Sequence, residues 1–525
     1  MTGLLKFFDY KPNRTTKTIF LILLMIFLNA LIQGYFINQI NFISPQDTGL
    51  LNIAREIVSK DTFTEAEKEL MEPYKNHPPL YSIICGVIYL FAGNIDIAPK
   101  IYYIIFSSAI IIPVFLISLR LYGMETAIIS TLLLIFLPAL STTIYYSMRH
   151  VIFIFLLYSS LYFVIIAYLD GKAKYYGYGG FLLGLTYLAR GEGLIIFLSL
   201  LFIIILISLF EEKKINITIS KKGIIFACCF MLVFIPHLLY LHNLTGNWSL
   251  GGDKKYQYVA FISGQGVADK IKGDSDDLSE YGYKIYGSGE ENNYSILNAI
   301  KKKPIAYLSR IVKNVRNLLD VLPSPTVLPF YLYPFIGFAL IESLRNVELM
   351  KVSIIFMAAI ISLIILLIMI FHVQPRLITP IVPIMAIWSA YGIKKTQDIL
   401  KEMNYKNLIY FPSIIIVLSL SVMFFAYTKT IADVIPRETK IIGEWVKSNT
   451  SLSDLVVVPK EWYDEKYYLQ YYSKRKVRND SSISGESILI LKEDQINLLN
   501  KKLILTELNT FKIKDKKIVV YKALL

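Results

Sequence analysis

Long apolar segments alternate with short charged connections along most of this chain. Eleven of these segments approach the roughly 20 residues that a helix needs to cross a bilayer. They cover residues 19–36, 101–121, 126–145, 151–169, 175–189, 194–210, 223–241, 327–344, 352–371, 378–393 and 408–427. A twelfth apolar segment, residues 79–92, is shorter and suits an interfacial or re-entrant helix better. The pattern therefore predicts about eleven transmembrane helices and an interfacial helix.

The charges in the connections predict the orientation. If residues 79–92 lie in the interface, the turn at Arg120 and the basic connections at 170–174, 211–222, 344–351 and 394–406 all fall on one side of the bilayer. By the positive-inside rule this side is the cytoplasm, and a span at 79–92 would violate the rule throughout. The basic N-terminus is expected to be cytoplasmic and to lead into a retained signal anchor.

Three longer polar segments then lie outside the cytoplasm, at residues 37–99, 242–326 and 428–525. The last reads as a small α/β domain, with helical spacing at 438–448 and short β-prone runs at 455–458, 488–491, 503–505 and 517–520. The expected fold is an all-α polytopic membrane domain over residues 1–427, with interfacial helices in its first outer loop. A small extracytoplasmic α/β domain over 428–525 follows it.

Composition narrows the function classes. Hydrophobic residues make up 55% of the 525 residues, charged residues only 18%, and the mean hydropathy is +0.51, which excludes a soluble protein of this length. The net charge of +14 lies mainly in loops, so nucleic acid is not an expected partner. Cys85, Cys228 and Cys229 lie in apolar stretches and predict no disulfide framework. No CxxC or HExxH motif is present, so no cofactor is predicted and no residue is assigned to a metal.

With this topology, several unusual polar residues fall on the outer face of the membrane. They are Asp47, His77, Arg149, His150, Arg190, Glu192 and Arg376. Ionisable groups at membrane depth are costly and usually line a site or pathway. A single arginine at the end of a span is more often an interfacial anchor, and Arg190 with Glu192 also fits a structural ion pair. The functional hypothesis rests on the convergence of all seven.

One carboxylate facing several guanidinium groups suits a particular chemistry. Arginine presents a fork of donors that matches phosphate oxygens. Preorganised cations stabilise the negative charge that develops on a departing phosphate, and a carboxylate can accept the proton of an incoming hydroxyl. The pattern indicates transfer of a group from a lipid phosphate to a hydroxyl.

Four segments carry a family resemblance. They are the acidic residue after the first span (Asp47), NHPPLYSIICGVIYLFAG (76–93), GLTYLARGEGLIIF (184–197) and PRLITPIVPIMAI (375–387). Together they resemble the C-type glycosyltransferase superfamily, which uses polyprenyl-phosphate sugars. The branch they resemble contains protein O-mannosyltransferases and lipid A aminoarabinose transferases.

The resemblance implies an inverting transfer of a hexose or pentose, with Asp47 as the general base. It implies that Arg149, Arg190 and Arg376 bind the donor phosphate, and that the substrates lie near His77, His150, Glu192 and Glu56. Glu56 is the nearest downstream alternative to Asp47 as the base. The implied partners are a polyprenyl-phosphate-linked sugar, a glycan, lipid or protein acceptor, and membrane lipids. The implied location is the cell membrane, with the outer loop 242–326 over an extracytoplasmic site.

Two departures from the family pattern matter. Relatives often carry an acidic residue at the outer start of the fourth span, where this chain reads Met148-Arg149-His150. This disfavours a metal-dependent variant. In addition, Asp47 is followed by Thr48 and Gly49, whereas the first-loop acid of the family is often followed by another acid.

Two other functions stay open at this point. A transporter or flippase of lipid-linked saccharides also needs many spans and an arginine-lined site, but the cytoplasmic halves of these spans look apolar. A non-catalytic scaffold that displays the C-terminal domain predicts that Asp47 and the arginines are dispensable.

Overall fold

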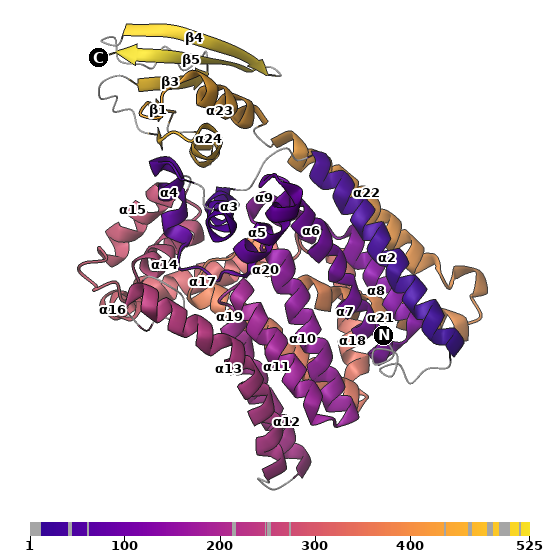
Figure 1. Cartoon of the computed structure of the whole chain (residues 1–525). Helices are drawn as coiled ribbons and strands as arrows, with labels where there is room; N and C mark the ends of the chain where they lie inside the picture. The colour runs from indigo at the N-terminus through magenta and orange to yellow at the C-terminus, as the bar shows by residue number, and fades with distance from the viewer. Residues whose placement is uncertain are drawn as a thin grey trace.

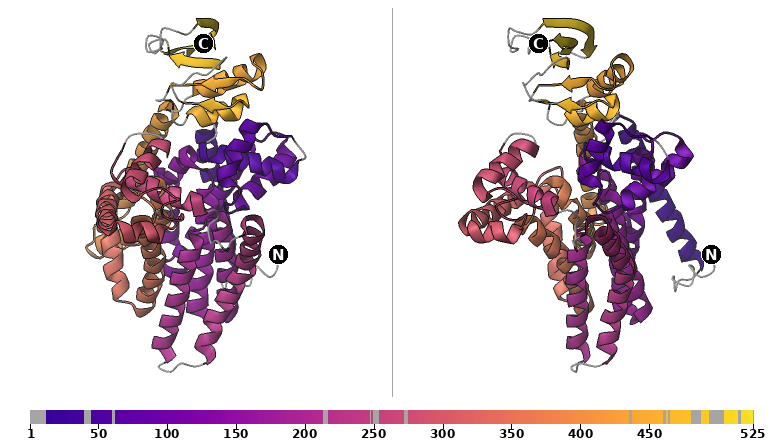
Figure 2. Two further views of the ribbon diagram at one scale, coloured as in Figure 1. Left: turned by 90° about the vertical axis from the view of Figure 1, so that its left-hand side faces the viewer. Right: turned by 60° about the vertical axis from the view of Figure 1, so that its left-hand side comes forward.

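A computed structural model describes residues 12–39, 45–59, 62–212, 217–246, 248, 254–271, 275–434, 437–459, 462, 465–479, 487–492, 504–513 and 516–524. The described chain forms a long helical bundle with a small sheet domain at one end (Figures 1 and 2). This architecture confirms the predicted fold class.

The bundle contains apolar helices of different lengths. They are α2 (Pro12–Gln39), α6 (Ala98–Ala109), α7 (Ile111–Tyr122), α8 (Met124–Phe136), α9 (Pro138–Tyr146), α10 (His150–Asp170), α11 (Ala173–Ala189), α12 (Gly193–Glu212), α13 (Ile217–Thr245), α18 (Tyr333–Leu344), α19 (Val347–Met369), α21 (Val382–Glu402) and α22 (Phe411–Val434). Short elements flank them: η2 (Phe330–Leu332), α20 (Pro375–Ile378), η3 (Thr379–Ile381) and η4 (Lys406–Leu408).

Seven helical segments among the described residues are long and apolar enough to cross a membrane. They cover 15–38, 98–122, 150–170, 221–245, 347–369, 375–402 and 411–429, and each matches a predicted span. The other four predicted spans coincide with shorter helices. The segment predicted at 126–145 is broken into α8 and α9, because Leu137 is extended and Pro138 can only begin a new helix.

Small residues let the bundle helices approach one another closely. A Cβ atom added to Gly180 of α11 would lie 2.1 Å from the carbonyl oxygen of Phe226 in α13. On another face of α11, a Cβ at Gly179 would lie 2.9 Å from the Val164 side chain in α10. Glycines at such interfaces allow the backbones of membrane helices to pack directly.

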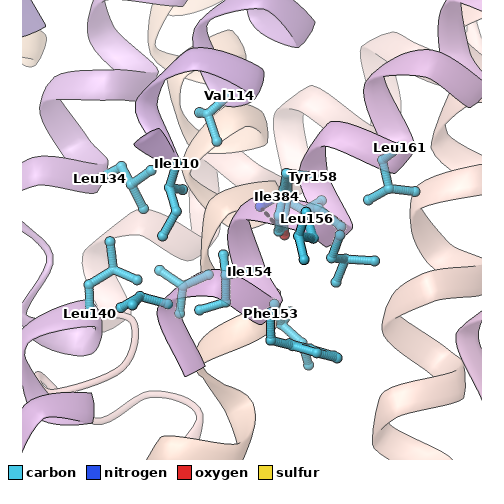
Figure 3. Close-up of a cluster of buried hydrophobic side chains, with 14 of the residues drawn as sticks. Ile110, Val114, Leu134, Leu140, Phe153, Ile154, Leu156, Tyr158, Leu161 and Ile384 are labelled. Carbon is cyan, nitrogen blue, oxygen red and sulfur yellow. Dashed lines mark hydrogen bonds between the residues drawn. The ribbon is translucent and has the colours of Figure 1, made fainter. Parts of the chain in front are cut away.

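A tyrosine replaces a helical hydrogen bond where η3 meets α21. The Tyr158 hydroxyl donates to the Pro380 carbonyl oxygen at 2.9 Å and accepts from the Ile384 N–H at 3.0 Å (Figure 3). A regular helix would join these two backbone groups directly. A side chain inserted into the backbone ladder accounts for the irregular turn, which sets the direction of the preceding α20.

The first outer segment is helical. It contains α3 (Pro45–Val58), α4 (Glu65–Met71), η1 (Glu72–Tyr74) and α5 (Leu80–Ala92). The 13-residue α5 is the short apolar helix predicted at 79–92. These helices lie between the bundle and the sheet domain (Figure 1).

The second outer segment, predicted as a long polar loop at 242–326, is instead mostly helical. It forms α14 (Lys254–Ala268), α15 (Ser275–Tyr286), α16 (Ile296–Lys302) and α17 (Pro304–Val321). The expectation of a loop was wrong because Tyr258, Phe261 and Tyr286 give these helices a small buried core. The buried Arg310 of α17 attaches them to the bundle by donating to the Ile370 carbonyl oxygen at 2.8 Å.

The C-terminal part contains α23 (Arg437–Asn449), β1 (Leu455–Val457), α24 (Glu465–Ser473), β2 (Val477–Arg478), β3 (Ser487–Lys492), β4 (Ile504–Ile513) and β5 (Lys516–Leu524). The sheet order is β2-β1-β3-β5-β4, with β1 parallel to β2 and β3, and β5 antiparallel to β3 and β4. The predicted helix and the four predicted β-prone runs are all present, whereas α24 and β2 were not predicted. The proposed domain limits at 427/428 stay a prediction, and α22 continues across them.

Candidate functional site

Asp47 lies in the first turn of α3 and is fully buried. Its carboxylate accepts a hydrogen bond from the Ser147 hydroxyl at 2.8 Å and one from the Met148 N–H at 2.9 Å. Both donors belong to the connection between α9 and α10. A Cβ at Gly49 would lie 2.2 Å from the Leu70 carbonyl oxygen, so glycine allows α3 to pack directly on α4.

His150 lies between Ser147, which contacts the Asp47 carboxylate, and Arg190, which follows α11. Its Nδ1 lies 3.0 Å from the Ser147 carbonyl oxygen, a group that can only accept, so Nδ1 carries the proton. Its Nε2 is then the acceptor for the Arg190 guanidinium, with which it is paired. Ser147 therefore contacts Asp47 through its side chain and His150 through its backbone.

Arg190 and Glu192 form the sharp turn between α11 and α12. Arg190 Nε donates to Glu192 Oε1 at 3.1 Å, and the two side chains form an ion pair. Burial raises the pKa of Glu192, but the charge and hydrogen bond of Arg190, a backbone hydrogen bond and the charge of Arg149 together outweigh burial and lower that pKa. A Cβ at Gly193 would lie 2.6 Å from the Tyr187 backbone nitrogen, so the turn needs glycine. Within this one turn, Arg190 therefore forms the ion pair with Glu192 and also contacts His150.

Arg149 lies on the other side of the cluster, beside the NHPPLY segment. Its Nη1 donates to His77 Nδ1 at 3.1 Å. Burial, together with the charges of Arg149 and Arg190, lowers the pKa of His77 to about 3. His77 is therefore neutral and accepts a hydrogen bond from a guanidinium group.

Tyr74 lies close to Arg149, Asp47 and Arg376. Burial raises the pKa of Tyr74 to about 12, and the charges of Arg149, Asp47 and Arg376 all act on it. Arg376 lies in α20, which packs against α9. Burial and the Arg376 charge also lower the pKa of His372 to about 3. Arg376 therefore lies beside the same cluster, although its segment is more than 300 residues from α3.

Of the residues singled out from the sequence, seven come together at the end of the bundle that faces the sheet domain. They are Asp47, His77, Arg149, His150, Arg190, Glu192 and Arg376. Glu56 does not join them. It is exposed, and it lies two and a half turns along α3 from Asp47, on the opposite side of the helix.

Two neighbours were missed from the sequence. Tyr74 precedes the NHPPLY segment and could have been included with that motif. Ser147 had no such signal, because its role depends on a contact across 100 residues of sequence.

The charges in this cluster do not suit a divalent cation. Three guanidinium groups lie in the same cluster as Asp47, and the other carboxylate is already paired with Arg190. Within the described residues, no group of three or more His, Cys, Asp or Glu side chains is placed to hold a metal ion.

Part of the sequence matches a known family. The model for dolichyl-phosphate-mannose-protein mannosyltransferases matches residues 76–240, which include His77, Arg149, His150, Arg190 and Glu192. No curated protein sequence matches the chain.

Solved structures match over most of the chain. ArnT from Cupriavidus metallidurans, in the apo state and bound to undecaprenyl phosphate, superposes with a TM-score of 0.56 at 10% identity, over 95% of this chain and 97% of ArnT. The Archaeoglobus fulgidus oligosaccharyltransferase, in a complex with zinc and sulfate, superposes with a TM-score of 0.55 at 13% identity, over 87% of this chain. This chain spans 62% of the length of that oligosaccharyltransferase. At these identities the likeness shows a shared fold. The family model that matches residues 76–240 bears out the resemblance seen in the sequence motifs of that segment.

Proposed function

Starting from a chain that has the C-type glycosyltransferase fold, we propose that it transfers a sugar from a polyprenyl phosphate to an acceptor hydroxyl at the non-cytoplasmic face of the cell membrane. One observation carries the proposal. The buried Asp47 carboxylate, oriented by Ser147 and Met148, lies beside a cluster of three arginines. This combination supplies both a proton acceptor and a site for a phosphate leaving group.

In the proposed reaction, the donor phosphate lies among Arg149, Arg190 and Arg376. The acceptor hydroxyl attacks the anomeric carbon from the side opposite the phosphate, which inverts the configuration. A new glycosidic bond forms while the bond from the anomeric carbon to the phosphate oxygen breaks, and the electron pair leaves with the polyprenyl phosphate. Asp47 takes the hydroxyl proton.

The hydrogen bonds of Asp47 are compatible with this role. Ser147 and Met148 donate to different oxygens of the carboxylate and orient it, as a general base requires. Because Asp47 is fully buried, the acceptor has to reach it through a local opening of the outer segments. Helix α4 and Tyr74 pack on α3 at Gly49, two residues from Asp47.

Two of the similar structures support the proposed classes of partner. ArnT was captured with undecaprenyl phosphate, and the oligosaccharyltransferase was captured with a tethered acceptor peptide. For this chain we propose a polyprenyl-phosphate sugar as the donor and a glycan, lipid or protein hydroxyl as the acceptor. The sugar is a hexose or a pentose.

The test compares wild type with Asp47→Asn after reconstitution with short-chain polyprenyl-phosphate sugars and a crude membrane extract as the source of acceptor. Release of polyprenyl phosphate is followed. Removing a general base is expected to lower the rate at least about a hundredfold. Glu56→Gln is the matched control, because it removes an exposed carboxylate from the same helix, and it is expected to retain wild-type rates.

Three results would contradict the proposal. Equal rates for wild type and Asp47→Asn would move the base elsewhere, and loss of activity in Glu56→Gln would move it to Glu56. Transbilayer movement of an intact lipid-linked saccharide, without release of polyprenyl phosphate, would favour the transporter instead.

A further inference from the structure

Glu67 is a buried carboxylate shared by three helices outside the proposed active site. Its side chain is only 2% exposed. Its Oε1 atom lies 2.9 Å from Arg55 Nη1 of α3 and 3.0 Å from Lys474 Nζ, next to the end of α24. Its Oε2 atom accepts from the Thr64 N–H at 2.9 Å, which completes a capping box at the start of α4.

A buried charge requires compensation from its neighbours. Burial would raise the pKa of Glu67, but the Thr64 N–H and the cations Lys474 and Arg55 together lower it. One cation comes from the helix that carries Asp47, and the other comes from the C-terminal domain. If either is removed, a buried carboxylate loses half of its compensating charge.

Further contacts join the same elements. Gln470 Nε2 of α24 donates to the Ala66 carbonyl oxygen of α4 at 2.9 Å. Helix α4 in turn packs directly on α3, where a Cβ at Gly49 would lie 2.2 Å from the Leu70 carbonyl oxygen. Gly49 is two residues from Asp47, so the contacts run continuously from the C-terminal domain to the proposed base.

The C-terminal domain has a second attachment at the start of α6. Tyr471 donates to Asp96 at 3.1 Å, and Lys440 Nζ lies 3.4 Å from the same carboxylate. The domain is therefore attached to the first outer segment at two points, and it lies against α3 and α4 in both views of Figure 2.

We propose that Glu67 is a positioning residue for Asp47, and that the C-terminal domain, through Lys474, is part of the catalytic unit. This inference rests on the proposed function, in which Asp47 is the base. Without Lys474, the ion cluster that joins α3 to α4 loosens, and the Asp47 carboxylate moves relative to the bound acceptor. Small displacements of this kind lower the rate of chemistry more than they change donor affinity.

The experiment compares Lys474→Met with Lys476→Met. Lys476 is a matched control, because it pairs with Glu69 across the same interface at 3.3 Å while both partners are about half exposed. Lys474→Met is expected to lower kcat about tenfold or more, with a change in donor KM of less than about twofold. Lys476→Met is expected to leave both unchanged, because exposed ion pairs contribute little.

A conservative variant separates positioning from a general loss of structure. Lys474→Arg keeps the cation beside Glu67 and is expected to retain wild-type kcat. If Lys474→Met fails to fold, Glu67→Gln serves as the test variant, because it removes the carboxylate charge that Arg55 and Lys474 share.

Hydrogen exchange of the α3 amides gives a readout that needs no substrate. Lys474→Met is expected to speed this exchange, and Lys476→Met is not. Wild-type kcat in a Lys474→Met protein would overturn the proposal, whether or not α3 exchanges faster. A wild type without turnover would instead overturn the proposed glycosyl transfer, and unchanged α3 exchange in Lys474→Met would independently overturn the attachment through Lys474.

Discussion

The ionisation of Glu192 and His77 follows from burial and from their immediate neighbours. The charge and hydrogen bond of Arg190, a backbone hydrogen bond and the charge of Arg149 together lower the pKa of Glu192 despite burial. Burial, with the charges of Arg149 and Arg190, keeps His77 neutral. Arg149 therefore donates to a neutral acceptor, whereas Arg190 forms an ion pair with Glu192. Among the proposed phosphate ligands, we expect Arg149 to contribute more to binding than Arg190.

The pKa of His77 makes a prediction about acid stability. Histidine has a pKa near 6.5 in an unfolded chain, whereas that of folded His77 is about 3. Between these values the unfolded state binds a proton that the folded state does not, so stability falls as the pH is lowered from 6.5 towards 3. His77→Gln removes this titration and keeps an acceptor for Arg149. In detergent, its apparent melting temperature should fall less between pH 7 and pH 4.5 than that of wild type; an equal fall would contradict the prediction.

Two glycines allow helix α11 to pack closely against its neighbours α13 and α10. Gly180 faces the α13 backbone, and Gly179 faces the side chain of Val164 in α10. The same helix ends one residue before Arg190, so its position determines where Arg190 and Glu192 lie. The packing of α11 within the bundle therefore also affects the geometry of the turn that carries Arg190 and Glu192.

Gly180→Ala tests this packing. The new Cβ would lie 2.1 Å from the Phe226 carbonyl oxygen, so α11 and α13 have to move apart. We expect a destabilisation of about 1–3 kcal/mol, measured as a lower apparent melting temperature. Gly337→Ala in α18 is the control, because its Cβ would meet no atom within 4 Å, and alanine favours a helix over glycine. Equal melting temperatures for Gly180→Ala and wild type would contradict the tight packing.

At the scale of the whole molecule, helices α3, α9 and α20, which carry or adjoin site residues, lie towards the same end of the bundle as the C-terminal domain (Figure 1). The positive-inside pattern predicts that this end is non-cytoplasmic. The donor phosphate, the acceptor and the C-terminal domain would then meet on the same side of the membrane.

Cysteine labelling tests this orientation in intact cells. Single cysteines replace the exposed residues Asn94, Lys172 and Asn404, in a background without the three native cysteines. An impermeant thiol reagent should label only Asn94 from outside and the other two only after permeabilisation. Labelling of Lys172→Cys and Asn404→Cys in intact cells would invert the proposed topology.

The sequence alone predicted the seven described helices that are long enough to cross a membrane, the short α5 helix and four of the five described strands of the C-terminal domain. These features follow from local hydrophobic periodicity and from segment length, which need no knowledge of distant contacts. The motifs around Asp47, His77, Arg190 and Arg376 also identified a set of residues that the fold brings together.

Only the tertiary structure decided which groups contact one another. It separated Glu56 from the cluster, turned the segment 242–326 into packed helices, and joined Ser147 to Asp47 and Lys474 to Glu67. The last pair is separated by about 400 residues of sequence. Such contacts depend on how whole helices pack, and the local pattern of apolar and polar residues carries no information about their partners.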